Sequence, residues 1–264
     1  MASGSILTFL QAGDTIDIQS NVTGVDVDPS VESLLLDVNN GASSGTVKIS
    51  GDITTTGTGA FKTITLKGKS GVHLGGTYKT LHDAASNNID IDGPVTLTAD
   101  LTVDTTANSG TIDFSSTINS EGNETNALTL KGKGGTIKIN GIIGGTQNIG
   151  ALKINDDDAN GTGAITLSGV GASNKVGITG TVDVGHTGTT GIDLAGSYYN
   201  IDGATKFMPC SNPINLRISS LSPRASSSSR SLSATSSTVN ADVSTDLNIQ
   251  KREEWSSASA LILF

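Results

Sequence analysis

Short stretches of alternating apolar and polar residues recur along most of this chain. The clearest ones follow one another between Asn88 and Leu167, separated by little more than Gly, Asn, Asp and Thr. They include Thr111-Ile-Asp-Phe114, Ala127-Leu-Thr-Leu130, Thr136-Ile-Lys-Ile139, Ala151-Leu-Lys-Ile154 and Ala164-Ile-Thr-Leu167. Alternation with period two, rich in β-branched residues, is typical of a strand with one buried face. Because the stretches return every roughly 9 to 17 residues, the sequence predicts a solenoid of stacked strands.

The predicted fold class is all-β, a right-handed parallel β-helix. No long stretch has the apolar spacing of an amphipathic helix, and Ala, Glu, Leu and Lys are too sparse between Gly and Thr to favour one. Strands that are linked without helical crossovers would pair in parallel between coils, and parallel crossovers are right-handed. Residues 34–76 and residues 127–169 can be aligned as two copies of an internal repeat that differ by insertions at turns.

Composition and charge narrow the possible partners. Aromatic residues make up only 3% of the chain and Gly numbers 33, which suits a narrow column of Val, Ile, Leu and Thr better than a globular core. The net charge of -9 is spread along the chain, which argues against nucleic acid or an anionic membrane as a partner. No apolar stretch approaches the ~20 residues of a membrane span, so we expect no membrane insertion. The N-terminal ten residues lack the positive region of a secretory signal peptide.

The chain changes character near Gly203. Every Gly lies at or before that residue, whereas every Arg, the only Trp and the single Cys210 lie after it. We therefore predict a β-helix region over residues 1–203 and a Ser/Arg-containing low-complexity tail over residues 204–264 that is mostly disordered or irregular. A segment that caps the open end of the solenoid is an alternative. A frameshifted or foreign coding end is another.

The repeats resemble those of a known family. Residues 93–103, 110–119, 126–141 and 142–154 are similar to the β-strand repeats of bacterial filamentous-haemagglutinin-like and autotransporter passenger adhesins. The resemblance covers residues 32–203 and implies a segment of a longer, secreted β-helix that is extracellular or displayed on the outer cell surface. It also implies a structural or adhesive role without catalysis, with a protein or glycan of a host or neighbouring cell as partner. A non-functional fragment of a repeat gene is a further possibility.

Outward-facing carboxylates support a rival interpretation, a β-helical carbohydrate-active enzyme. Asp90, Asp92, Asp113 and Asp193 occupy polar positions of predicted strands, and a β-helix can place two carboxylates side by side on adjacent coils, as lyases and hydrolases of this shape do. Surface charge in contact with solvent is the simpler explanation. Lys or Arg on the facing coils would favour the enzyme, but every Arg lies outside the solenoid.

The histidines do not form a catalytic motif. His73 lies inside a predicted strand, His82 in a loop and His186 in a Gly-Thr turn, and none accompanies a Gly-x-Ser-x-Gly elbow. We interpret all three as solvated or packing residues.

One acidic segment has the pattern of a calcium loop. Asp156, Asp158 and Asn160, followed by Gly161, reproduce the first half of the D-x-D-x-N-G motif, in which alternate oxygens converge on Ca²⁺. The position of the closing bidentate Glu is occupied by Leu167. The sequence thus predicts at most a weak Ca²⁺ site and no other cofactor, and a tight turn held by Asp and Asn side chains is the alternative.

Overall fold

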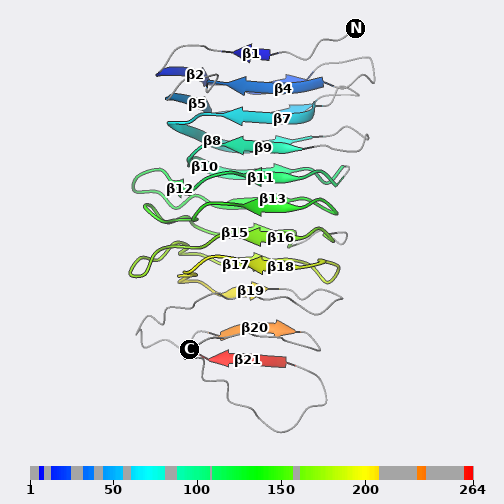
Figure 1. Cartoon of the computed structure of the whole chain (residues 1–264), viewed down its shortest axis with the longest axis vertical. Helices are drawn as coiled ribbons and strands as arrows, with labels where there is room; N and C mark the ends of the chain where they lie inside the picture. The colour runs from blue at the N-terminus through cyan, green and yellow to red at the C-terminus, as the bar shows by residue number, and fades with distance from the viewer. Residues whose placement is uncertain are drawn as a thin grey trace.

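The computed structural model describes residues 6–8, 13–24, 32–38, 44–55, 61–80, 88–107, 109–156, 161–207, 231–235 and 259–263. These residues form 21 strands and no helix, arranged as coils stacked along one long axis (Figure 1). All strand pairs but one are parallel. The predicted all-β parallel solenoid is confirmed.

The strands form two sheets. Sheet A has eight strands in the order β1 (Ile6–Thr8), β4 (Glu32–Asp37), β7 (Phe61–Lys67), β9 (Ile89–Asp92), β11 (Ile112–Phe114), β14 (Ile137–Ile139), β16 (Ile165–Leu167) and β18 (Ile192–Leu194). Sheet B has thirteen strands: β2 (Asp14–Ile18), β3 (Val22–Gly24), β5 (Gly45–Ile49), β6 (Ile53–Thr55), β8 (Gly71–Lys79), β10 (Val95–Asp104), β12 (Ile118–Ser120), β13 (Leu128–Lys131), β15 (Leu152–Ile154), β17 (Val182–Val184), β19 (Thr205–Phe207), β20 (Ser231–Thr235) and β21 (Ser259–Leu263).

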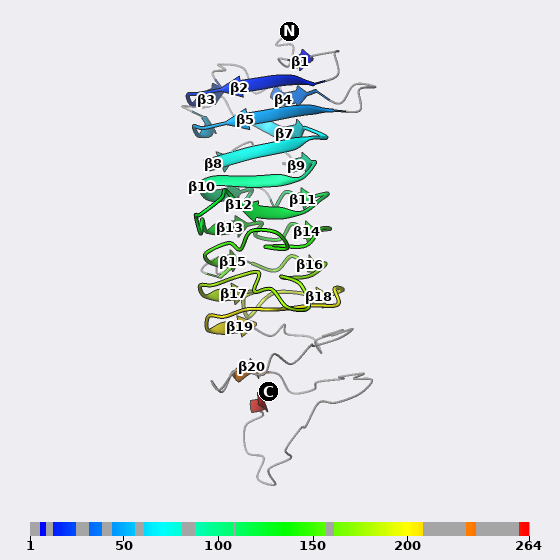
Figure 2. The same cartoon turned by 90° about the vertical axis from the view of Figure 1, so that its left-hand side faces the viewer.

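Each central coil has three faces. Face 1 is sheet A, face 2 contains β5, β12 and the first halves of β8 and β10, and face 3 contains β13, β15, β17 and the second halves of β8 and β10. Faces 2 and 3 belong to one sheet because β8 and β10 run through the corner between them, which the register shift between Leu97 and Leu101 marks. Figure 2 shows these two long strands crossing the side next to sheet A.

The core consists of columns of apolar side chains, one from each coil. On face 1 one column contains Ile64, Ile89, Ile112, Ile137, Ile165 and Ile192, which occupy equivalent positions on neighbouring strands and are all buried. Burying one such side chain contributes about 1.5–3 kcal/mol. No single coil can bury its own apolar face, so stability comes from stacking.

The Asn and Asp residues between strands hold neighbouring coils together. Asp52 Oδ1 accepts a hydrogen bond from Thr77 N at 2.7 Å, and Asn88 Oδ1 accepts one from Thr111 N at 3.0 Å. These side chains satisfy backbone N–H groups at or next to the corners of the coils. This is why Asn and Asp separate the strands so regularly in the sequence.

The internal repeat does not correspond to equivalent coils. In the alignment of residues 34–76 with residues 127–169, strand matches strand, but β4 on face 1 meets β13 on face 3 and β5 on face 2 meets β14 on face 1. All three faces use the same inward-apolar alternation, so the alignment matches strands without matching faces.

The ladder continues past the predicted boundary at residue 203. Strand β19 pairs in parallel with β17, β20 pairs in parallel with β19, and β21 pairs antiparallel to β20. The segments 208–230 and 236–258 lie outside the described residues, so the disorder expected there stays a prediction.

Candidate functional site

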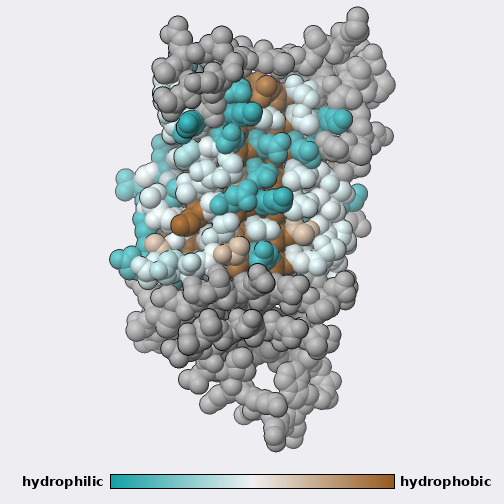
Figure 3. Space-filling view, in the orientation of Figure 1, coloured by the Kyte–Doolittle hydropathy of each residue, from teal (hydrophilic) through white to brown (hydrophobic). Residues whose placement is uncertain are grey.

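Two rows of polar side chains run along the outside of face 1. Parallel pairing between neighbouring strands aligns the first row, which contains Thr65, Asp90, Asp113, Lys138, Thr166 and Asp193. The second row lies two residues further along each strand and contains Lys67, Asp92, Ser115, Asn140 and Ser168. Figure 3 shows this face as a mixture of hydrophilic and near-neutral residues, with apolar residues visible between them.

Asp90 and Asp113 are the only two carboxylates of the predicted set that are direct neighbours across strands. Asp113 Oδ1 accepts a hydrogen bond from Asn140 Nδ2 at 2.7 Å, and Asp92 Oδ1 accepts one from Ser115 Oγ at 2.9 Å. Among the described residues no hydrogen bond or ion pair joins Asp90 to a partner. Partial burial raises the pKa of Asp90, the adjacent Asp113 raises it further, and Lys67 opposes the change. Asp193 lies apart from the other carboxylates. It is on β18, and its register partner is Thr166 on β16.

Two lysines that the sequence could not place flank the carboxylates. Lys67 lies opposite Asp92 on the neighbouring strand and forms a 3.7 Å ion pair with Asp37. Lys138 lies opposite Asp113. Face 1 therefore combines adjacent carboxylates with lysines on the coils to either side, which is the arrangement that would favour an enzyme. The alternation in the sequence places these Asp and Lys residues at outward positions of their strands. Only the register shows that they are neighbours across strands.

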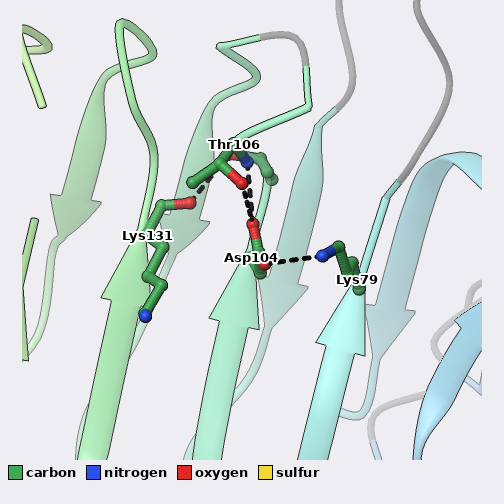
Figure 4. Close-up of polar contacts among 5 residues, drawn as sticks. Lys79, Asp104, Thr106 and Lys131 are labelled. Carbon is green, nitrogen blue, oxygen red and sulfur yellow. Dashed lines mark hydrogen bonds and ion pairs between the residues drawn. The ribbon is translucent and has the colours of Figure 1, made fainter. Parts of the chain in front are cut away.

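On face 3 the charges alternate in sign from coil to coil. Asp104 lies between Lys79 and Lys131 in the register of the sheet, and its carboxylate forms a 3.2 Å ion pair with Lys79 (Figure 4). The same carboxylate accepts hydrogen bonds from Thr106 N at 2.9 Å and Thr106 Oγ1 at 2.6 Å. Lys206 and Asp183 form a second pair at 3.5 Å. Exposed pairs of this kind contribute about 0–1 kcal/mol each, and their alternation favours the observed register over a slipped one.

The histidines take no part in either arrangement. His73 lies on β8, where burial and the nearby Lys48 lower its pKa and Glu121 opposes this. His186 lies in a turn closed by Thr189, whose Oγ1 accepts a hydrogen bond from His186 N at 2.8 Å. His82 lies outside the described residues.

The predicted calcium ligands are described only in part. Asp156 forms a 3.1 Å ion pair with Lys153 through Oδ2, and its buried Oδ1 has no hydrogen-bond partner. Asp158 and Asn160 lie outside the described residues. Across the part of the chain that is described, no three His, Cys, Asp or Glu side chains come close enough to hold a metal ion.

Comparison with models of protein families, with curated proteins and with solved structures gave no match. Within the described ranges there is also no helix long and apolar enough to cross a membrane.

Proposed function

We propose that this chain is a structural and adhesive segment of a secreted or surface-exposed bacterial protein, and that it acts by binding. The observation that supports this most is the double row of polar side chains on face 1. Parallel strands fix these side chains at intervals of about 4.8 Å between coils and about 6.6 Å along each strand. Donors and acceptors held in this way lose little entropy on binding, and many weak contacts can act together.

The surface suits an extended polar partner. Small-molecule sites are usually concave and apolar, whereas the two rows on face 1 contain Thr, Ser, Asn, Asp and Lys, and the half-exposed Leu35 of β4 adjoins the first row beside Thr65. Among the described residues, Ile142 is the only large hydrophobic side chain that is exposed, so these residues offer no broad apolar patch for a hydrophobic interface. The proposed partner is a glycan or a polar protein surface on a host or neighbouring cell. We propose that this chain, as part of a longer protein, contacts it outside the cell.

The test is adhesion of the full chain with one face altered at a time. The chain, immobilised on beads, should bind cultured cells or a glycan array, and the double variant Lys138→Ala with Asn140→Ala should lose most of that binding. Thr102→Ala with Thr129→Ala alters the outward row of face 3 and should bind as the parent does. Equal loss in both variants, with unchanged circular dichroism, would refute the assignment to face 1.

A β-helical carbohydrate-active enzyme is the second candidate, and one observation favours it. Asp90 and Asp113 are adjacent across strands, with Lys67 and Lys138 on the coils to either side. Adjacent strands lie about 4.8 Å apart, near the ~5–5.5 Å between the carboxyl groups of a nucleophile and acid pair. If the parent releases reducing ends or unsaturated products from a panel of polysaccharides and Asp113→Asn does not, this candidate replaces the adhesive one.

A further inference from the structure

Among the described residues of face 1, the boundary between β9 and β11 is the one place where two carboxylates lie side by side. Asp90 has Thr65 opposite it on β7 and Asp113 opposite it on β11. Elsewhere in the described rows of this face, an Asp is opposite a Lys or a hydroxyl residue, as Asp193 is opposite Thr166. Like charges that are directly opposite on adjacent strands destabilise the pairing.

The groups around Asp90 only partly relieve this repulsion. On β7, Lys67 is near enough to Asp90 to lower its pKa, but Lys67 also forms an ion pair with Asp37 at 3.7 Å. On β9 itself, Asp92 adds a further negative charge, and its Oδ1 is engaged by Ser115. Asn140 donates to Asp113 and leaves Asp90 without a donor. Lys138 on β14 adjoins Asp113, on the side away from Asp90.

We propose that the Asp90–Asp113 pair is an acid-responsive joint between two coils of the β-helix. When the solution is acidified, the Asp90 carboxylate takes one proton from solvent and donates it in a hydrogen bond to a carboxylate oxygen of Asp113. No covalent bond other than the new O–H changes. The repulsion across the joint is replaced by a charge-assisted O–H···O⁻ bond, which is among the stronger hydrogen bonds.

The direction of the pH dependence follows from proton binding. Burial and the adjacent Asp113 raise the pKa of Asp90 in the folded chain above the ordinary value of 3.8. The folded chain therefore holds more protons than the unfolded chain between that value and the raised one, so the free energy of unfolding decreases as pH rises through this interval. Because coil interfaces contribute separately in a solenoid, the effect is centred on β9 and β11. It does not depend on what face 1 binds.

The first measurement is an NMR titration of the side-chain carboxyl carbons in the full chain. Asp90 should titrate above the ordinary aspartate value of 3.8. In Asp113→Asn the midpoint for Asp90 should move down, and in Asp193→Asn, the matched control on the same face, it should stay. If Asp90 titrates at the ordinary value in the parent, or if Asp113→Asn leaves its midpoint in place, the two carboxylates do not share a proton and the proposal fails.

The second measurement asks whether the proton tightens the joint. The Ile89 amide donates a hydrogen bond to Thr111 O at 2.9 Å and the Ser115 amide donates one to Ile91 O at 3.0 Å, so both amides link the coil of β9 to the coil of β11. After correction for intrinsic exchange rates, these amides should open about 1.4- to 5-fold less at acidic pH, the range that corresponds to the energies of single cross-strand side-chain pairs. Asp90→Asn should abolish this difference. A parent whose opening does not change with pH would refute the joint even if Asp90 titrates high. Should Asp113→Asn not fold, Asp90→Asn provides the same comparison from the other partner.

Discussion

Replacing Gly135 by Ala would place a methyl group where two coils meet. A β-carbon at this position would lie 2.0 Å from Gly110 O and 2.5 Å from Ser109 O, in the preceding coil. Ordinary contact begins at 3.4 Å, so the nearer atom would have to move by about 1.4 Å, the difference between 3.4 and 2.0 Å. That is a large part of the ~4.8 Å spacing between strands. The next coil repeats the arrangement, because Gly163 approaches Gly135 O in the same way.

The expected cost follows from the atoms that obstruct the methyl group. Both are backbone carbonyl oxygens held in the stack, so a change of rotamer cannot relieve the contact. Inserting a methyl group into a packed interior costs about 1–3 kcal/mol, and occasionally more. We expect Gly135→Ala to lower the free energy of unfolding by at least the upper part of that range.

Gly122 provides the matched control. It is exposed in a turn, and a β-carbon there would meet nothing within 4 Å. Gly122→Ala should leave stability unchanged or raise it by about 0.4–1 kcal/mol, because Ala restricts the unfolded chain. Urea unfolding followed by circular dichroism measures both variants. A Gly135→Ala midpoint equal to that of Gly122→Ala would show that the coils do not approach as closely as described.

Three further predictions concern the core, a buried phenol and the acidic turn. Ile137→Ala should lower the free energy of unfolding by about 2–5 kcal/mol, whereas the outward Lys138→Ala on the same strand should change it by less than about 0.5 kcal/mol; urea midpoints decide. Burial raises the pKa of Tyr199 to about 12 from 10.0, so the folded chain keeps a proton that the unfolded chain loses, and stability should fall as pH rises from about 10 to about 12. Tyr199→Phe should show a smaller alkaline loss in the same urea assay. If Asp156, Asp158 and Asn160 hold calcium, millimolar calcium should raise Tm by binding the folded chain, and Asp158→Ala should remove the shift; equal shifts with magnesium, or a shift that Asp158→Ala retains, would show that the segment is a tight turn without a calcium site.

Much of the strand structure was predictable because a strand has only two sides. In β14, Ile137 and Ile139 are buried and Lys138 is exposed, as the alternation in the sequence predicts. The same alternation places Asp90 and Asp113 on the outside of their strands. These positions can be predicted without knowing which strands are neighbours.

The register was not predictable, because it depends on the lengths of the corners. The register partners Ile89 and Ile112 are 23 residues apart, whereas Ile137 and Ile165 are 28 apart. A variable coil length leaves the partner of each Asp undetermined, so the sequence grouped Asp193 with Asp90 and missed Lys138. The strands of face 2 were also hard to predict, because in some coils this face is formed by a single bridging residue, as in the bridge between Ile143 and Val170.

Residues of successive coils lie opposite one another on a single face, and a pair of engineered cysteines tests this directly. Thr102 and Thr129 are register partners on face 3, at a spacing of about 4.8 Å that a disulfide can bridge. Thr111 is much closer to Thr102 in sequence but lies at the start of face 1. With Cys210 replaced by Ser, mild oxidation should link Thr102→Cys to Thr129→Cys, detected by mass spectrometry of the digested chain, and should leave Thr102→Cys with Thr111→Cys unlinked. A disulfide that forms only in the second pair would contradict the parallel stacking on which the fold and both proposals depend.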